Sequence, residues 1–161
     1  MVVILMGVSG SGKTTLGLRL AGDLGWPFID ADDFLPPRSA EKMARGEDLS
    51  DADVQTWIEL VRAKVAATAQ RGGNAVLAYA GLKSGSRHRL AIDRQSVRFV
   101  YLKGNVNLVR RRLRYRSGFF LRENILVSQF AALEEPDDAV IIDIDERPGR
   151  IVDQIRQALS L

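Results

Sequence analysis

The chain has 161 residues, of which 46% are hydrophobic and 27% charged, and its formal net charge is +3. This length predicts one domain over residues 1–161 with a substantial core, and no apolar run reaches the roughly 18 residues that a transmembrane helix needs. The chain has no cysteine, which excludes disulfides and thiolate metal sites, and no basic segment precedes its first apolar run, so we expect a cytoplasmic protein.

The first expected element is a buried strand, Val2–Met6, which leads into the segment Gly7–Thr14. That segment matches G-x-x-x-x-G-K-[ST], the phosphate-binding loop (P-loop) of P-loop NTPases, and a helical run over 14–24 follows it, as the motif requires. Backbone N–H groups of such a loop, together with the helix dipole, bind phosphates. We expect Lys13 to reach the β- and γ-phosphates of ATP and the Thr14 hydroxyl to ligate Mg²⁺. The expected nucleotide-binding residues are Gly7, Ser9, Gly10, Ser11, Gly12, Lys13, Thr14 and Thr15.

A second strand, expected over 26–30, ends in the acidic run Asp30-Ala31-Asp32-Asp33. Three acids are costly to crowd together without a cation nearby. A phosphotransferase needs carboxylates to hold Mg²⁺ and to deprotonate the acceptor hydroxyl. In an extended segment Asp30 and Asp32 would point the same way. We expect Asp32 to bind the acceptor and act as the base, with Asp30 supporting the metal; a helix cap or turn is the structural alternative.

Strands and helices continue to alternate along the rest of the chain, and Gly72-Gly73 and Pro136 end two of the helices. This alternation predicts an α/β fold in which a parallel sheet carries helices on both faces, the three-layer arrangement of P-loop NTPases. Sites in such sheets lie at the carboxyl ends of the strands. The further expected elements are helices over 40–45, 51–70, 84–92, 106–115, 123–133 and 149–161, and strands over 75–80, 97–102 and 139–144.

A third cluster follows the strand over 75–80, where small residues alternate with cations over 81–87. Small residues let a substrate approach the backbone, and Lys83 and Arg87 could hold an anionic group. We therefore expect Gly81, Lys83 and Arg87 to bind the acceptor, with the γ-phosphate as another possible partner of the two cations. A surface loop before a helix is an equally good interpretation. The lone His88 is expected on an exposed helix surface.

Arginines gather over 110–116, and a Gly-containing turn follows them. Arg112 and Arg116 lie four residues apart, which suits a helical lid over about 112–126 that closes on the phosphates. We expect Arg112 to bind the nucleotide and Arg116 to act catalytically by neutralising charge on the transferred phosphoryl group. The arginine run could also bind RNA, but Tyr115 is the only aromatic stacking platform nearby. We expect neither a nucleic-acid nor a membrane partner.

These segments together resemble the gluconokinases of the small P-loop type, the thermoresistant gluconokinases, which are relatives of shikimate kinase. The resemblance runs from Val3 to about Ile144, and its most specific stretch is LVSQF-x-x-LE-x-P over 126–136. It implies a five-stranded parallel sheet with a helical lid, ATP and Mg²⁺ as cofactors, the phosphorylation of gluconate to 6-phosphogluconate, and often a homodimer. Further matching stretches are MGVSGSGKTT, DDF-x-PP, EKMARGEDLSDAD, Leu82-Lys83 with Arg87, and FVYLKG.

The ATP side keeps the family pattern, whereas the acceptor side departs from it. Arg and His donors suit the carboxylate of a sugar acid, and their loss predicts that gluconate is a poor substrate and that another hydroxylated acceptor is better. Arg38, Arg45 or Arg122 restoring the carboxylate contact is the competing possibility. The departures are Leu35 for His, Ser39 for Asn, Val54 for Arg, Ala80 for Ser, Ser86 for Tyr and Phe119 for His.

Two alternatives to a sugar-acid kinase stay open. One is a kinase of another polyol, cyclitol or sugar-derived acceptor. The other is a non-catalytic nucleotide-binding regulator. Retention of Asp30, Asp32 and the lid arginines favours an enzyme, because a regulator has no need of a base.

Overall fold

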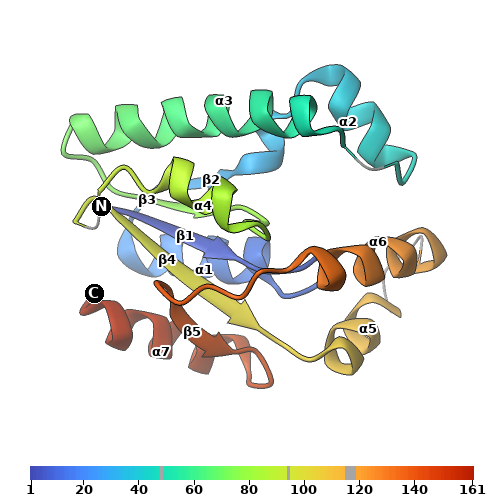
Figure 1. Cartoon of the computed structure of the whole chain (residues 1–161). Helices are drawn as coiled ribbons and strands as arrows, with labels where there is room; N and C mark the ends of the chain where they lie inside the picture. The colour runs from blue at the N-terminus through green and yellow to red at the C-terminus, as the bar shows by residue number, and fades with distance from the viewer. Residues whose placement is uncertain (48, 94, 115–118) are drawn as a thin grey trace.

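Five parallel strands form the central sheet of the structure, a computed structural model that describes residues 1–47, 49–93, 95–114 and 119–161. The strands are β1 (Val2–Met6), β2 (Phe28–Asp30), β3 (Ala75–Ala78), β4 (Val97–Lys103) and β5 (Val140–Asp143). Their order is β2-β3-β1-β4-β5, and all four neighbouring pairs are parallel. Because β1 is central, the P-loop that follows it starts from the middle of the sheet's carboxyl edge (Figure 1).

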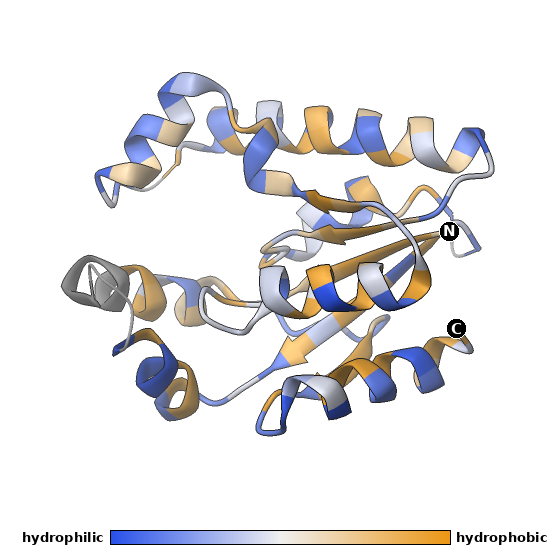
Figure 2. Ribbon diagram, turned by 180° about the vertical axis from the view of Figure 1, so that it is seen from behind, coloured by the Kyte–Doolittle hydropathy of each residue, from blue (hydrophilic) through white to orange (hydrophobic). Residues whose placement is uncertain are grey.

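Helices cover both faces of this sheet (Figures 1 and 2). One face carries α1 (Lys13–Leu24) and α7 (Pro148–Leu159), and the opposite face carries α3 (Asp51–Gln70) and α4 (Ser84–Leu90). The strands are the most continuously apolar segments of the ribbon, while the helices alternate between apolar and polar residues (Figure 2). This is the three-layer α/β arrangement that the alternating pattern predicted, and the fold class is confirmed.

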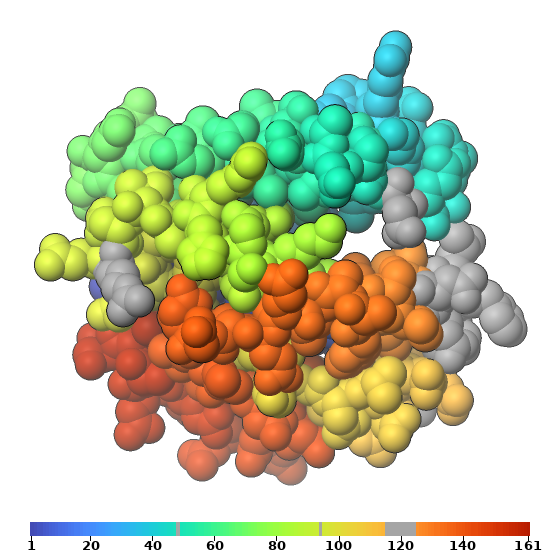
Figure 3. Space-filling model, in the orientation of Figure 1, coloured from blue at the N-terminus to red at the C-terminus, as the bar shows by residue number. Residues whose placement is uncertain are grey.

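The remaining helices lie around the carboxyl edge of the sheet. A 3₁₀ helix, η1 (Ala31–Phe34), and α2 (Pro37–Ala44) follow β2, while α5 (Val106–Arg114) and α6 (Phe119–Ala132) come between β4 and β5. In the space-filling view the surface is hollowed between α3 and α6, so the edge that carries the P-loop opens into a cleft (Figure 3). The elements with predicted functional residues therefore meet on one side of the molecule.

Burial on both faces explains why β1 reads as an unbroken apolar run. All five of its side chains are 0% exposed. Val3 and Leu5 pack into the cluster under α1 and α7, while Val2, Ile4 and Met6 pack into the cluster under α3 and α4. The strand that carries the P-loop is thus the best buried part of the core, which gives the loop a rigid base.

Several element boundaries differ from the predicted ones. Helix α2 starts at Pro37 rather than at 40, because proline, which lacks an N–H, fits the first helical turn. Strand β2 begins only after Pro27, and α6 begins at Phe119 rather than at 123. No helix among the described residues is long and apolar enough to span a membrane.

Candidate active site

The P-loop adopts a conformation that depends on its glycines. Gly7, Gly10 and Gly12 have φ angles of 146°, 82° and 100°, which other residues rarely adopt. A Cβ atom on Gly7 would lie 2.9 Å from the carbonyl oxygen of Leu102, and one on Gly10 would lie 3.0 Å from the Leu113 side chain. The loop therefore packs directly against β4 and α5, and both contacts need glycine.

Lys13 folds back across this loop. Its Nζ donates hydrogen bonds to the carbonyl oxygens of Gly7 at 2.9 Å and Val8 at 3.0 Å. Burial lowers the pKa of Lys13 to about 8, although the carboxylates of Asp32 and Asp30 act in the opposite direction. The predicted phosphate-binding amine thus lies at the loop beside the acidic run, and the first N–H groups of α1 beside it have no intrahelical partner.

The acidic run is not extended, because residues 31–34 form η1, and the extended conformation on which the shared direction of Asp30 and Asp32 was predicted is wrong. Asp30 ends β2 and caps η1, because its Oδ1 accepts from the Asp32 backbone N–H at 3.2 Å. The other oxygen, Oδ2, accepts from the Thr14 hydroxyl at 3.3 Å. The capping role, considered only as the alternative, is therefore real, and the same carboxylate also faces the P-loop.

Asp32 lies in the electrostatic environment of both Asp30 and Lys13. Burial raises the pKa of Asp32, the charge of Asp30 raises it further, and the Lys13 ammonium opposes both. A carboxylate with a raised pKa is a stronger base than an ordinary one. Its position next to the phosphate-binding amine fits the role predicted for it.

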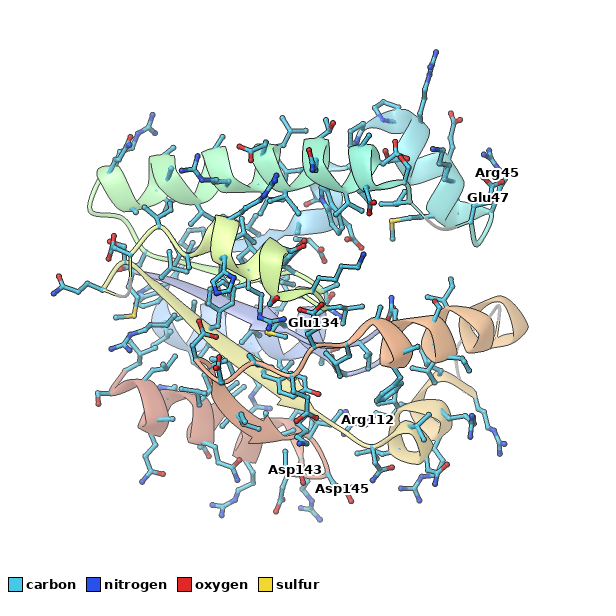
Figure 4. All side chains as sticks on the ribbon, in the orientation of Figure 1. Arg45, Glu47, Arg112, Glu134, Asp143 and Asp145 are labelled. Atoms are coloured by element: carbon cyan, nitrogen blue, oxygen red, sulfur yellow. The ribbon has the colours of Figure 1, made fainter. Side chains whose placement is uncertain are left out.

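A cavity of about 280 Å³ adjoins the P-loop on the side of α5 and α7. Arg112 lines it, and Arg112 Nη2 donates to the carbonyl oxygen of Ile144 at 2.5 Å. Figure 4 shows Arg112 near Asp143 and Asp145, where β5 ends. The cavity is therefore placed to receive the part of a nucleotide that lies beyond its phosphates. Its lining residues are Gly10, Gly12, Thr15, Leu16, Arg112, Pro148 and Ile151.

The loop after β3 is supported from inside by Arg87. This side chain is 5% exposed, and its Nη1 donates to the carbonyl oxygens of Gly81 at 2.9 Å and Leu82 at 3.2 Å. Lys83 is exposed, with its Nζ 3.9 Å from the Asp51 carboxylate at the start of α3. The structure thus gives Arg87 a loop-supporting role, while acceptor binding by Gly81, Lys83 and Arg87 stays a prediction.

Two polar residues that no motif rule identified join the α6 region to the site. Gln129 Oε1 accepts from the Ser9 backbone N–H at 2.6 Å. Glu134, labelled in Figure 4, accepts from the Ser84 backbone N–H at 2.7 Å and donates its own N–H to the Leu82 carbonyl at 2.8 Å. The only sequence signal for either residue was the specificity of the LVSQF-x-x-LE-x-P stretch.

The opposite wall of the cleft comes from η1, α2 and α3. Trp57 Nε1 donates to the Ala31 carbonyl at 2.6 Å, and the Trp57 ring meets Tyr79 edge-on with 5.2 Å between centroids. Leu35 and Val54 pack against the apolar cluster that contains Trp57. Two of the positions that depart from the family pattern therefore belong to the apolar packing around Trp57, which we call the apolar wall.

A polar network joins α2 to α3 beside this wall. Asp53 accepts from Lys42 Nζ at 2.6 Å, from the Ser39 hydroxyl at 3.3 Å, and from the Ser50 backbone N–H at 3.1 Å. Hydrogen bonds from Lys42 and Ser50 hold the pKa of Asp53 well below its usual range. A second cavity of about 440 Å³ lies here, lined by Pro36, Pro37, Arg38, Ser39, Asp53 and Thr56.

The remaining predicted residues divide into described and undescribed ones. His88 is exposed, which confirms its interpretation as a surface residue. Arg116, the predicted catalytic arginine, lies outside the described residues, as does part of the predicted lid over about 112–126. The described ends of that lid are the last turn of α5 and the beginning of α6.

Comparisons with known proteins give matches over most of this chain. A family model described as an AAA domain matches residues 2–136. The thermoresistant gluconokinase of Escherichia coli (strain K12) is 35% identical over 149 residues, which cover 90% of this chain and 85% of that protein.

Solved structures give the same result at the level of the fold. A gluconokinase from Sinorhizobium meliloti 1021 superposes with a TM-score of 0.89 at 30% identity, covering 98% of this chain and 90% of the other. A sugar kinase from Janibacter sp. HTCC2649 has a TM-score of 0.89 at 33% identity, covering 99% and 94%.

Proposed function

The chain belongs to the gluconokinase family of P-loop kinases, and we propose that it transfers the γ-phosphoryl group of ATP to a hydroxyl of gluconate, giving 6-phosphogluconate, or of a related sugar acid. It is an ATP-dependent phosphotransferase with an alcohol acceptor. The observation that carries the proposal is the meeting of Lys13, Thr14, Asp30 and Asp32 at one end of the sheet. A phosphate-binding loop and a candidate base are both needed for phosphoryl transfer, and here they adjoin each other.

The donor site is formed by the P-loop and the cavity beside it. The N–H groups at the start of α1 and the Lys13 ammonium bind the β- and γ-phosphates. Arg112 and Pro148 bind the base end of the nucleotide in the 280 Å³ cavity. The Arg112 guanidinium, which donates to the Ile144 carbonyl, would contact the ring of the nucleotide base from the side of α5.

The oxygen atoms of Thr14 and Asp30 fit a magnesium ion. Mg²⁺ in phosphotransferases is bound by one or two protein oxygens, with phosphate oxygens and waters completing the shell. Thr14 Oγ1 and Asp30 Oδ2 are such a pair and already lie 3.3 Å apart. Bound Mg²⁺ would neutralise charge on the β- and γ-phosphates.

Asp32 is the base of the proposed reaction. The acceptor hydroxyl gives its proton to the Asp32 carboxylate as its oxygen forms a bond to the γ-phosphorus. The bond from that phosphorus to the β–γ bridging oxygen breaks, and ADP leaves. Lys13 stabilises the charge that grows on the bridging oxygen, and Arg116 in the proposed lid over about 112–126 stabilises charge on the transferred group.

The proposal includes a wider set of properties. Residues 1–161 form a single kinase domain, with Gly81, Lys83 and Arg87 on the acceptor side. A homodimer in the cytoplasm, without a nucleic-acid partner, is part of the same proposal.

A second candidate acceptor is another polyol or cyclitol, less anionic than gluconate. The observation in its favour is the apolar wall of Leu35 and Val54 beside Trp57. The deciding experiment is to follow ADP release with ATP and Mg²⁺ over a panel of sugar acids, polyols and cyclitols. Gluconate is the acceptor if its kcat/KM is the highest of the panel. ADP release without any acceptor dependence would contradict the kinase proposal.

A further inference from the structure

A side chain from α6 holds the tip of the P-loop. Gln129 Oε1 and the Ser9 backbone nitrogen are 2.6 Å apart, although the two residues are 120 positions apart in sequence. Gln129 and Phe130 lie three and four residues after Leu126, so each is a neighbour of Leu126 on the surface of α6. Leu126 is fully buried, and both apolar residues pack in the same cluster as Val8 of the loop. The apolar packing of α6 therefore places the polar side chain of Gln129 against the P-loop.

The segment that follows α6 keeps this helix in place. Glu134 accepts from the Ser84 backbone N–H at 2.7 Å. Glu135 accepts from Lys103 Nζ at 2.8 Å at the end of β4. These two contacts hold the C-terminal end of α6 on two different elements. They therefore limit the conformational freedom with which Gln129 meets the loop. A preorganised contact of this kind is what holds a binding loop in one geometry.

The N–H group that Gln129 engages differs from those that the helix directs at phosphates. The first-turn N–H groups of Lys13, Thr14 and Thr15 have no intrahelical partner and are available to an anion. Ser9 lies in the other limb of the loop, before Gly10. A hydrogen bond at Ser9 therefore orders the loop without occupying the first-turn groups.

We propose that Gln129 is a positioning residue that holds the P-loop in its nucleotide-binding conformation before the nucleotide arrives. A loop that is ordered in advance loses less conformational entropy on binding, and this raises its affinity for the ligand. The inference rests on the proposed use of the P-loop for ATP, but it does not depend on which acceptor is phosphorylated.

The test compares Gln129→Met with a matched control. Methionine has a similar length and no oxygen acceptor, while Gln157→Met makes the same change at an exposed position of α7. The first readout is amide hydrogen exchange at Ser9 in the nucleotide-free protein, measured by NMR. The second is the dissociation constant of a non-hydrolysable ATP analogue with Mg²⁺.

We expect Gln129→Met to speed exchange at Ser9 and to weaken analogue binding about 5- to 10-fold, the scale of one lost hydrogen bond, with the melting temperature close to that of Gln157→Met. Gln129→Glu, which keeps an oxygen at the same reach, should restore slow exchange.

Unchanged exchange at Ser9 in Gln129→Met, or tighter analogue binding, would overturn the inference, because Gln129 would then be a bystander or a competitor of the phosphates. The exchange measurement needs no nucleotide. Failure of the wild-type protein to bind the analogue would instead count against the proposed function.

Discussion

The Thr14 hydroxyl donates to Asp30 Oδ2 over 3.3 Å, so the first turn of α1 and the end of β2 share a hydrogen bond. Both oxygens belong to the proposed magnesium site. An arriving ion would exchange this hydrogen bond for two ligands that are already close together, directly or through a water molecule. The relationship makes the metal dependence of the reaction a sharp test of the site.

We expect Thr14→Val and Asp30→Asn to raise the Mg²⁺ concentration needed for half-maximal activity by about 10- to 100-fold, the usual cost of losing a group that supports a metal. Titration of activity with Mg²⁺ at saturating ATP measures this shift. Thr68→Val is the control, because Thr68 is remote on α3 and its hydroxyl donates to the Lys64 carbonyl of its own helix. A wild-type titration curve for both site variants would remove Thr14 and Asp30 from the metal site.

Lys13→Ala should abolish turnover while the protein stays folded, because no other group replaces the charge opposite the β–γ bridge. Activity measurements check the loss of turnover, and circular dichroism checks that the protein stays folded. Lys64→Ala on the exposed side of α3 provides the matched control and should behave as wild type. Substantial phosphoryl transfer by folded Lys13→Ala would refute the proposed mechanism.

The lowered pKa of Lys13, about 8, predicts a pH dependence of ATP binding. Above pH 8 the free protein must take up a proton to present a charged Lys13, so affinity should fall with rising pH, by up to about tenfold per unit. Equilibrium titrations from pH 6 to 10 measure this slope. Lys13→Ala should show weak binding without it.

Protein stability should respond to the same group with the opposite sign. Between pH 8 and 10.5 the unfolded chain binds a proton at Lys13 that the folded chain has released. The contribution of Lys13 to stability therefore increases with pH in this range. If ATP affinity falls between pH 8 and 10.5 while the Lys13 contribution to the free energy of unfolding does not fall, the loss of affinity is not caused by unfolding of the protein.

Asp32→Asn should reduce kcat by about 10²- to 10⁴-fold, the usual contribution of a positioned proton acceptor, with little change in ATP affinity. Asp33→Asn is the neighbouring control and should retain activity. Steady-state kinetics with the best acceptor give both values. A normal Asp32→Asn with an inactive Asp33→Asn would reassign the base.

Val54→Arg should increase the preference for gluconate over a neutral polyol, since it returns a cation to the apolar wall. One hydrogen bond to a charged group, about 1.5–3 kcal/mol, corresponds to about a 10- to 150-fold change in the ratio of kcat/KM values. Val54→Leu should leave the ratio unchanged. A wild-type kcat/KM for gluconate of about 10⁴–10⁸ M⁻¹s⁻¹, above that of every other acceptor, would show that the wall does not exclude sugar acids.

The donor half of the site was predictable from sequence because its geometry is local. The eight consecutive residues Gly7–Thr14 contain the turn, the lysine and the hydroxyl, and the flanking strand and helix follow from hydropathy alone. The shape of the acidic run was not predictable in the same way. The Asp30 carboxylate has two possible donors, the Asp32 backbone N–H and the Thr14 hydroxyl, and only the packed structure shows that it accepts from both.

Long-range contacts were also beyond the sequence patterns. The hydrogen bond from the Ser9 N–H to Gln129 Oε1 depends on how α6 packs against the P-loop after the chain has crossed the sheet several times. Arg87 was predicted to bind an anion because it is a cation in a loop of small residues. The sequence gives no sign that its Nη1 donates to two carbonyl groups of the same loop. Local motifs predict local geometry, and tertiary packing decides the rest.

The central position of β1 also bears on how the protein is made. Val2 pairs with Ala75 on one side and with Val97 on the other. At a synthesis rate of about 5–20 residues per second, the second partner leaves the ribosome's active centre about 5–19 s after Val2. Throughout that interval the five apolar residues of β1 have no completed sheet to enter, so the segment that becomes the foundation of the P-loop is a site where the nascent chain needs protection from aggregation.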